Sequence, residues 1–491
     1  MKMARLIAVT IVPLCISLIG GCAGNDVPPA PTPPVPPAPE PAPTPAPEPA
    51  QLPTTRCCEG YTLLSPVGPG SHGIFVNMNG EIVKELELVD LCKMLPCGSI
   101  LGTKRVRTGK DDPLAPSPEP PGGAPPGAPS PGGPPPGGPP GGTPWFDAIE
   151  FVQVSWDGVE EWSTCCWDDD GTGVMMSRQH HDFQREGNPV GYYAPGQECL
   201  KQGKTLLLAH KNKVVPKISD KELVDDVIYE VDENGKLTGF EWHAADHFEE
   251  FGFDQSARDA ICNNPHFEPE KERGDWLHLN TLSVLGQNHW FDETGDERFN
   301  PENIMICSRS ANFVAIISRG TGDVVWKVGP DFVTGTPEYN LGQFVGSHHA
   351  HMIPKGLPGE GNILIFDNGG NSGYGGPTDF PRYTRQYSRV VELNPVTLEV
   401  AWQYGAESGD EFFFSHNISS AQRLPNGNTL ITDGANGRVF EVTPEKEIVW
   451  DIMCPLKGPQ GPARVYRAYR VPPEWVPGNP EGYTEWATLY E

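Results

Sequence analysis

A short run of β-branched and aromatic residues recurs along the chain, each time after a turn and usually with a tryptophan near its end. Such runs, bounded by Gly, Asn or Pro, are typical of β-strands. Six copies predict six similar structural units, with loops of unequal length between them. The copies are NGEIVKEL from Asn79, WDGVEEWS from Trp156, NGKLTGFEW from Asn234, TGDVVWKVG from Thr321, TLEVAWQYG from Thr397 and EKEIVWDI from Glu445.

The better units contain several strand signals each, for example GNILIFDNG, SRVVELNP and LEVAWQYG, separated by turns at Asn, Gly and Pro. Four-stranded units repeated around an axis form a β-propeller, because each sheet buries its faces against its neighbours. We therefore predict an all-β, six-bladed β-propeller, with an open β-sandwich as the competing architecture. The run VYRAYRVPPEW is expected to close the ring, and short helices are expected at residues 221–227 and 254–262.

The first 22 residues have the order of a targeting segment. Lys2 and Arg5 precede an apolar run at residues 6–19, and two glycines lead to Cys22. The final cysteine resembles that of a bacterial lipoprotein signal, with Cys22 as the lipidated N-terminus, and an ordinary secretory signal is the alternative. Ala23 after the cysteine indicates the outer membrane in that pattern. We expect a lipid-anchored protein of the cell envelope, outer-membrane bound, on the periplasmic or surface face.

Proline and glycine, with 55 and 56 residues, concentrate in two tracts that cannot build a core. The first favours an extended polyproline tether, and the second interrupts the folded region as a disordered insert. The expected organisation is a signal peptide at 1–22, a Pro-rich disordered tether at 23–56, a propeller domain at 57–480 with its insert at 113–144, and a C-terminal tail at 481–491.

The formal net charge of −28 argues against a nucleic-acid partner, because phosphate binding is driven by clusters of Lys and Arg. A small anionic substrate is not excluded, since it needs only a local group of His and Arg side chains.

Ten cysteines follow the targeting segment. In an exported chain an even number suggests disulfides, although their connectivity does not follow from the sequence. The adjacent pairs leave a thiolate metal site as the alternative, without the two-residue spacing of known zinc sites. The ten are Cys57, Cys58, Cys92, Cys97, Cys165, Cys166, Cys199, Cys262, Cys307 and Cys454.

Four histidines open the innermost strand signal of four different units: His181, His278, His348 and His416. A propeller brings such positions to the mouth of one central channel. Converging imidazoles predict an anion or metal site, whereas the alternative is that each histidine only caps its strand.

Metal binding is the more specific alternative to an anion site, because His348, His349 and His351 are close in sequence and imidazole is a common metal ligand. On a strand, however, 349 and 351 face one side and 348 the other, so the three are not a ready-made chelate. We expect no metal and no cofactor.

Several long motifs resemble the bacterial arylsulfate sulfotransferase family, from about Gly60 to Pro477 and most closely after Asp275. This resemblance implies a six-bladed propeller enzyme of the cell envelope that moves a sulfuryl group from one phenol to another, without a nucleotide sulfate donor and through a sulfohistidine. The motifs are DWLHLN (275–280), SHHAHMIPKGLPGEGNILIFDNG (347–369), YSRVVELNP (387–395), SHNISSAQRLPNGNTLI (415–431), GRVFEVTPEKEIVW (437–450) and YRAYRVPPEWVPG (466–478).

By the same resemblance, His416 matches the nucleophile, and His278 and His348 match the histidines that hold the sulfuryl oxygens. The family arginine closes an FDNGDxR segment, whereas this chain reads FDNGGNSGYGG, so another arginine has to replace it. Further candidates for catalysis or substrate binding are Arg382, Arg385, Arg389, His349, His351, His181, Asn417 and Gln422.

The residue chemistry agrees with such a transfer. A neutral imidazole is a competent nucleophile, and two displacements are each easier than one. His and Arg donors suit the negative charge of the transition state, and His349 or His351 is a candidate general base. The expected partners are a small phenolic sulfate donor and a phenol acceptor, with a homodimer as a further expectation. The alternatives are a non-catalytic propeller that binds a glycan, peptide or sulfated polymer, and, more weakly, a quinone-dependent dehydrogenase.

Overall fold

The computed structural model describes residues 57–68, 70–106, 147–169, 173–188, 193–197, 200–265, 273–330, 332, 335–370, 373–374, 385–406, 409–459 and 461–490. Contacts divide the chain into Met1–Pro49 and Ala50–Glu491, and every described residue belongs to the second unit. Cys22, the signal at 1–22, the tether at 23–56 and the insert at 113–144 lie outside the described residues. Within the described part of the chain, no helix is long and apolar enough to cross a membrane.

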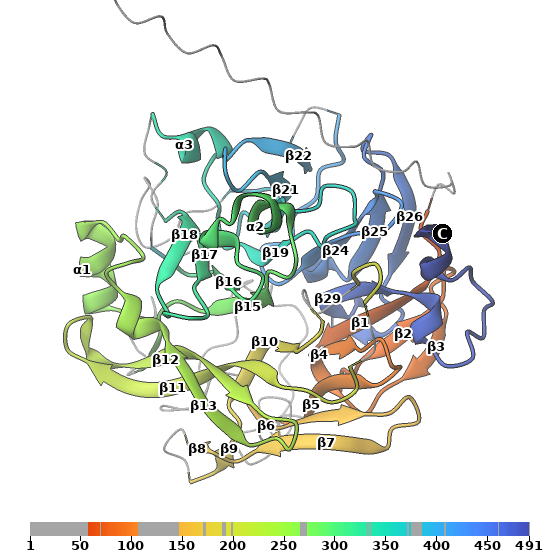
Figure 1. Cartoon of the computed structure of the whole chain (residues 1–491), viewed down its shortest axis with the longest axis horizontal. Helices are drawn as coiled ribbons and strands as arrows, with labels where there is room; N and C mark the ends of the chain where they lie inside the picture. Colours follow the sequence, from red (N-terminus) through yellow and green to blue (C-terminus); the bar gives the residue numbers. More distant parts are fainter. Residues whose placement is uncertain are drawn as a thin grey trace, which may run out of the picture. The chain divides into compact units, whose positions relative to one another are not determined.

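Four separate sheets of four antiparallel strands are arranged around a common centre in the second unit (Figure 1). Two of these sheets consist of β29 (Arg464–Val471), β1 (Tyr61–Val67), β2 (Ile74–Val76) and β3 (Ile82–Glu85), and of β15 (Leu279–Val284), β16 (Ile304–Ser308), β17 (Phe313–Ile317) and β18 (Val324–Val328). The other two consist of β19 (His348–Met352), β20 (Ile363–Asp367), β21 (Arg389–Leu393) and β22 (Val400–Tyr404), and of β23 (Ser420–Arg423), β24 (Thr429–Asp433), β25 (Arg438–Val442) and β26 (Ile448–Met453).

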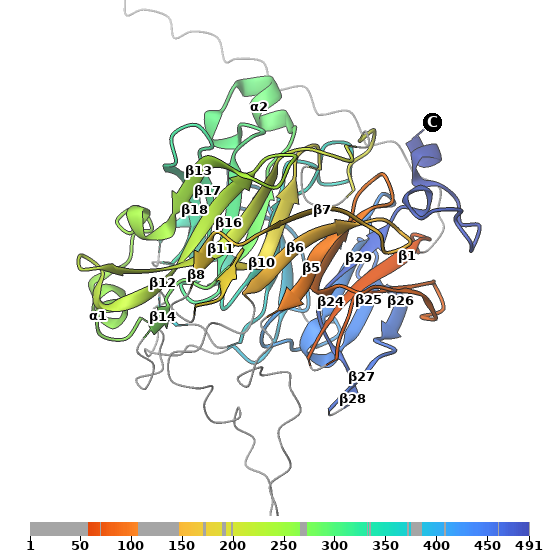
Figure 2. The ribbon, with the colours of Figure 1, turned by 90° about the horizontal axis from the view of Figure 1, so that it is seen from below.

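A fifth, nine-stranded sheet holds the earlier part of the domain, and Figure 2 shows its strands β11, β10, β6 and β5 side by side. Its strands β10 and β6 pair through Gln179 and Ala148 alone. Its members are β4 (Val89–Met94), β5 (Ile100–Val106), β6 (Ala148–Val154), β7 (Glu160–Cys165), β10 (Gln179–Arg185), β11 (Thr205–Val215), β12 (Ser219–Val231), β13 (Leu237–His243) and β14 (Arg273–Asp275).

The remaining elements are short. The two-stranded sheets are β8 (Asp168–Asp169) with β9 (Met175–Met176) and β27 (Lys457–Gly458) with β28 (Gly461–Pro462). The helices are α1 (Gln255–Asn263), α2 (His289–Thr294) and α3 (Pro337–Leu341), and the 3₁₀ turns are η1 (Ala244–His247), η2 (Glu297–Phe299), η3 (Gly434–Asn436), η4 (Pro473–Trp475) and η5 (Trp486–Tyr490).

The prediction of an all-β, propeller-like fold is confirmed, but the prediction of six separate blades is wrong. Four blades are separate in the described chain, because the Gln179 to Ala148 pairing merges the remaining strands into one sheet. The helix expected at 221–227 is also wrong, since that segment lies within β12, which pairs with both β11 and β13. The helix expected at 254–262 is confirmed as α1, which Asp254 caps by accepting a hydrogen bond from Ala257 N.

The last long strand, β29, closes the fold as the sequence predicted. It pairs antiparallel with β1, with Tyr61 opposite Val471. The innermost strands then contact one another in a closed series, from β29 through β4, β10, β15, β19 and β23 back to β29. Strands such as β16, β17, β20 and β21 are buried along their whole length, because both faces of each sheet pack against neighbours.

The recurring tryptophans link one unit to the next. In four copies the indole Nε1 donates a hydrogen bond to a backbone carbonyl in or beside the turn that opens the following unit, which fixes neighbouring sheets relative to each other. The pairs are Trp242 with Gly322, Trp326 with Pro395, Trp402 with Pro444, and Trp450 with Met78.

Candidate active site

Left-handed backbone marks the entry to four inner strands. His181, His278, His349 and Ile418 have φ of 52°, 51°, 50° and 52°. Such values are uncommon outside glycine and collect at sites where a turn aims a side chain. The four histidines named from the sequence therefore do not share one backbone position, because His349 rather than His348 is left-handed in β19 and His416 precedes Ile418 by two residues.

His278 is oriented by a carboxylate. Its Nδ1 donates to Asp275 Oδ2 at 2.5 Å, and the ring of His181 lies 4.6 Å from the ring of His278. A carboxylate can only accept, so the neutral His278 ring carries its hydrogen on Nδ1 and keeps a lone pair on Nε2. An aspartate bonded to Nδ1 in this way fixes the tautomer and the orientation of the imidazole ring.

His348 is linked to the segment that carries His416. Its Nδ1 donates to Asn368 Oδ1 at 2.8 Å and to Gly346 O at 3.0 Å. The amide nitrogen of Asn368 donates in turn to Ser415 O and Ile418 O, each at 2.8 Å. Asn368, in the FDNG motif, therefore holds His348 and the His416 segment together.

His416 is exposed, and its ring has no hydrogen-bond partner within the described part of the chain. Its backbone is nevertheless fixed, because a Cβ at Gly370 would lie 1.7 Å from His416 O, so only glycine fits there. Although the side chain reaches solvent, surrounding protein atoms partly desolvate the ring, and this, followed by the charges of Arg464 and Arg309, lowers the pKa of His416 below its ordinary value of 6.5. The imidazole is thus neutral near pH 7 and available as a nucleophile.

Arg309 is the arginine that sequence reasoning missed. It directly follows β16, is half-buried, and its backbone N–H donates to His278 O at 3.2 Å. Burial is the main cause of the strongly lowered pKa of His348, and the Arg309 charge lowers it further, as it does for His416. The signal was present, because NIMICSRS aligns with NILIFDNG and places Arg309 where the next sheet has Asn368.

The arginines named in advance are engaged elsewhere. Arg385 donates to Gln343 O and pairs with Asp367, and Arg389 pairs with the same Asp367 carboxylate at 2.8 Å. Both therefore stabilise the start of β21. Arg382 lies outside the described residues.

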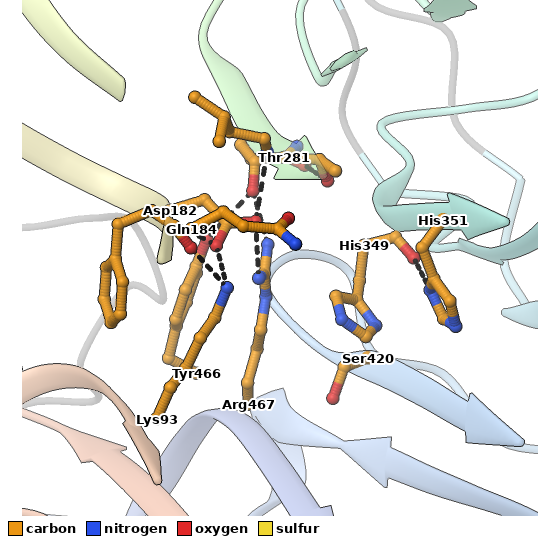
Figure 3. A network of polar contacts seen from close by, with 12 residues as sticks. Lys93, Asp182, Gln184, Thr281, His349, His351, Ser420, Tyr466 and Arg467 are labelled. Carbon is orange, nitrogen blue, oxygen red and sulfur yellow. Dashed lines mark hydrogen bonds and ion pairs between the residues drawn. The ribbon is translucent and has the colours of Figure 1, made fainter. Parts of the chain in front are cut away.

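His349 and His351 belong to a different network, drawn in Figure 3 with Arg467 and Asp182. His349 Nδ1 donates to Ala421 O at 2.9 Å, and His351 Nδ1 donates to His349 O at 3.2 Å. None of the hydrogen bonds of either ring reaches His416. Burial lowers the pKa of His349 strongly and that of His351 to about 4, so both are weak bases at neutral pH.

Ion pairs fill the centre between the inner strands (Figure 3). Asp182 accepts from Lys93 Nζ at 2.6 Å and from Arg467 Nη1 at 2.8 Å, and all three side chains are buried. Removing one partner from such a group leaves an uncompensated buried charge, which makes it a structural anchor. Asn417, a further candidate, accepts from Arg464 Nη2 at 2.6 Å at the outer side of the His416 segment.

A small cavity, with room for about one water molecule, lies beside His181. Tyr466 lines it, with its ring 5.7 Å from the His181 ring, and burial raises the pKa of the lining Asp90 carboxyl to about 7. The remaining lining residues are Val67, Leu91, Thr103, Gln179 and His180.

The fold and this site define a β-propeller-like protein with a neutral, exposed histidine, whose segment Asn368 links to His348 and whose pKa the charge of Arg309 lowers. The sequence pattern of the arylsulfotransferase (ASST) family matches residues 197–451, just over half of the 491 residues. The chain belongs to the arylsulfotransferase family, as the sequence motifs indicated.

Two solved structures resemble the chain distantly. A protein of unknown function from Bacteroides caccae aligns with a TM-score of 0.37 and 12% identity over 84% of this chain and 98% of its own. Virginiamycin B lyase from Staphylococcus aureus aligns with a TM-score of 0.33 and 9% identity over 81% of this chain and 86% of its own. TM-scores this low carry no functional argument. No curated protein matches the chain.

Proposed function

We propose that this protein transfers a sulfuryl group from a phenolic sulfate ester to an acceptor phenol, without a nucleotide donor and through a sulfohistidine at His416. Membership of the arylsulfotransferase family supports the class of reaction. The observation that carries the mechanism is the His416 ring, which is exposed, without a hydrogen-bond partner in the described chain, and lowered in pKa.

In the first displacement the neutral His416 imidazole attacks the sulfur of the aryl sulfate. The N–S bond forms while the S–O bond to the phenolate breaks, which leaves a positively charged ring bearing a neutralising sulfonate. Negative charge on the non-bridging oxygens is stabilised by the Arg309 guanidinium, in the role that cationic donors have in phosphoryl transfer. The departing phenolate takes a proton from the His278 imidazolium or from water.

In the second displacement the acceptor phenol loses its proton to His278 Nε2 and attacks the same sulfur. The N–S bond breaks and returns neutral His416. Asp275 stabilises the imidazolium that forms on His278, because their 2.5 Å hydrogen bond already fixes the ring. The proton on His278 is the one that the next departing phenolate receives, so the cycle balances.

Tyr466 lies beside His181 and offers an aromatic ring for contact with an aryl substrate.

The position in the cell also remains a proposal: lipid attachment at Cys22 and residence in the envelope. Labelling of expressed protein with a fatty acid, and its loss in Cys22→Ser, is the expected result. Equal labelling of both chains would contradict it.

The transfer is tested with purified protein, a nitrophenyl sulfate ester and an excess of a second phenol. The expected result is release of nitrophenol with stoichiometric sulfation of the acceptor. His72→Ala, a histidine near the surface outside the site, serves as the matched control. Binding of the ester without any release would favour a non-catalytic binding protein instead.

A further inference from the structure

A second group of polar side chains lies in the nine-stranded sheet. His180, His210 and Asp226 come from three neighbouring strands, β10, β11 and β12, and His210 stands directly opposite Asp226 in the pairing register. Their exposed fractions are 1%, 1% and 0%. One possible ligand atom of each side chain lies within 4.8 Å of those of the other two. His180 Nε2 and His210 Nε2 lie 3.3 and 3.8 Å from Asp226 Oδ1.

These three converging atoms have no hydrogen-bond partner. The opposite edge of each side chain is held instead. His210 Nδ1 donates to Asp147 Oδ1 at 2.6 Å, Asp226 Oδ2 accepts from Leu279 N at 3.2 Å, and His180 Nδ1 lies 2.7 Å from His181 Nδ1. Orphaned buried polar atoms cost about 1–3 kcal/mol each, so three at one point call for a bound group.

Charge favours a cation there. Arg178 pairs with Asp147 at 2.9 Å, and Lys213 lies 3.6 Å from Asp225. For Asp226, the ion-pair neighbours in the described chain are His180 at 3.3 Å and His210 at 3.8 Å, without a lysine or arginine. A fully buried carboxylate with only imidazoles beside it lacks a compensating positive charge.

We propose that His180, His210 and Asp226 bind one divalent first-row transition metal ion, with Zn²⁺ as the best match. Zinc about 2.0–2.2 Å from two imidazoles and a carboxylate separates the ligand atoms by about 3.0–3.6 Å. Of the two separations from Asp226 Oδ1, the 3.3 Å to His180 Nε2 lies within this range, and the 3.8 Å to His210 Nε2 is slightly longer and would have to shorten on binding. Asp147 behind His210 is the outer carboxylate that commonly fixes the tautomer of a metal-bound histidine.

The two imidazoles stack nearly parallel, with ring centroids 3.5 Å apart and an interplanar angle of 11°. Binding therefore requires both rings to tilt toward the ion through their side-chain torsions. The ion would then fasten β10 to β11 and β12, and so hold His181 beside His278. This role does not depend on sulfuryl transfer.

The test uses the full chain without an affinity tag, stripped with a chelator and then titrated with Co²⁺ and with Zn²⁺. The expected result is one equivalent of Co²⁺ per chain with visible ligand-field absorption, displaced by Zn²⁺, and a rise in melting temperature with either ion. Asp226→Asn keeps an acceptor for Leu279 N, and His210→Gln keeps a polar group of similar size. Each should weaken Co²⁺ binding at least about tenfold.

His243→Gln is the matched control, because His243 lies in the same sheet and faces Asp225 at 3.4 Å without belonging to the proposed site. It should bind Co²⁺ as the unchanged chain does. Failure of the folded, unchanged chain to bind Co²⁺ or Zn²⁺ stoichiometrically would overturn the proposal, whatever the variants do. Undiminished binding by folded Asp226→Asn would overturn it as well.

Discussion

The tryptophans between the sheets and the histidines near the centre both recur with the repeated unit, yet their surroundings differ. Four indoles do the same thing, each donating to a carbonyl of the following unit at 2.7–3.0 Å. Three histidines do three different things: His278 bonds to Asp275, His348 to Asn368, and His416 is exposed. The shared kind of partner indicates a structural role for the tryptophans. The different partners indicate that the histidines have different chemical roles.

The largest effect should come from His416→Ala. Loss of a nucleophile removes the covalent route, so kcat/KM should fall by about 10⁴-fold or more. The melting temperature should barely change, because the ring is exposed and forms no hydrogen bond in the described chain. If the variant keeps activity within tenfold of the unchanged protein, the nucleophile is a residue other than His416.

Arg309→Gln should have the next largest effect. Removing one cationic donor from a transition state of this kind costs about 10²–10³-fold in kcat. Arg385→Gln is the matched comparison, since Arg385 pairs with Asp367 and should affect stability more than the rate per folded molecule. If Arg385→Gln lowers the rate and Arg309→Gln does not, the assignment of the arginine is reversed.

Asp275→Asn should slow turnover by about 10²-fold, as loss of an oriented general base does. The first release of phenol should survive as a rapid burst, because the attack of His416 does not need that base. Stopped-flow measurement with a chromogenic sulfate separates the two steps. Loss of the burst together with turnover would instead place Asp275 in the first displacement.

The pH profile gives a smaller but diagnostic effect. The pKa of His416 lies below 6.5, owing to burial and to the charges of Arg464 and Arg309. Protonation removes the nucleophile, so kcat/KM should stay level down to pH 6.5 and fall only below it. Arg464→Gln removes one lowering charge and should move the acid limb toward higher pH. A fall in kcat/KM that begins above pH 6.5, and that Arg464→Gln does not shift, would contradict this assignment of the acid limb to His416.

Trp326→Phe should leave the rate per folded molecule unchanged while lowering the free energy of unfolding by about 1–3 kcal/mol, because it orphans Pro395 O. Chemical denaturation measures the stability, and the transfer assay measures the rate. A large loss of transfer rate in fully folded Trp326→Phe would contradict the separation of structural tryptophans from catalytic histidines.

Much of the architecture could be read from local patterns. The apolar run in GNILIFDNG and the alternation in LEVAWQYG predict strands, and the run VYRAYRVPPEW predicts the closing strand, because these signals lie in consecutive residues. The prediction of a helix at 221–227 was wrong. The local pattern fits a short helix, but the segment pairs with strands on both sides as part of β12. The single pairing of Gln179 with Ala148, which merges two sets of strands, leaves no signal in either residue.

The site was predictable only in part. His278, His348 and His416 were found from motifs, and shared contacts through Asn368 and Arg309 link their surroundings. His180, His210 and Asp226 were missed because three neighbouring strands bring them together from distant positions in the sequence. Arg309 was missed because the expected arginine was sought only in the FDNG segment and among the arginines that follow it, whereas Arg309 lies at the equivalent turn of the preceding sheet.

The most direct test of the central claim is mass spectrometry of the protein quenched shortly after exposure to an aryl sulfate without acceptor. The account predicts one sulfuryl group per chain, located by fragmentation on His416, absent in His416→Ala, and lost on addition of a phenol. A sulfuryl group on another residue, or transfer at full rate with no adduct on the protein, would contradict it.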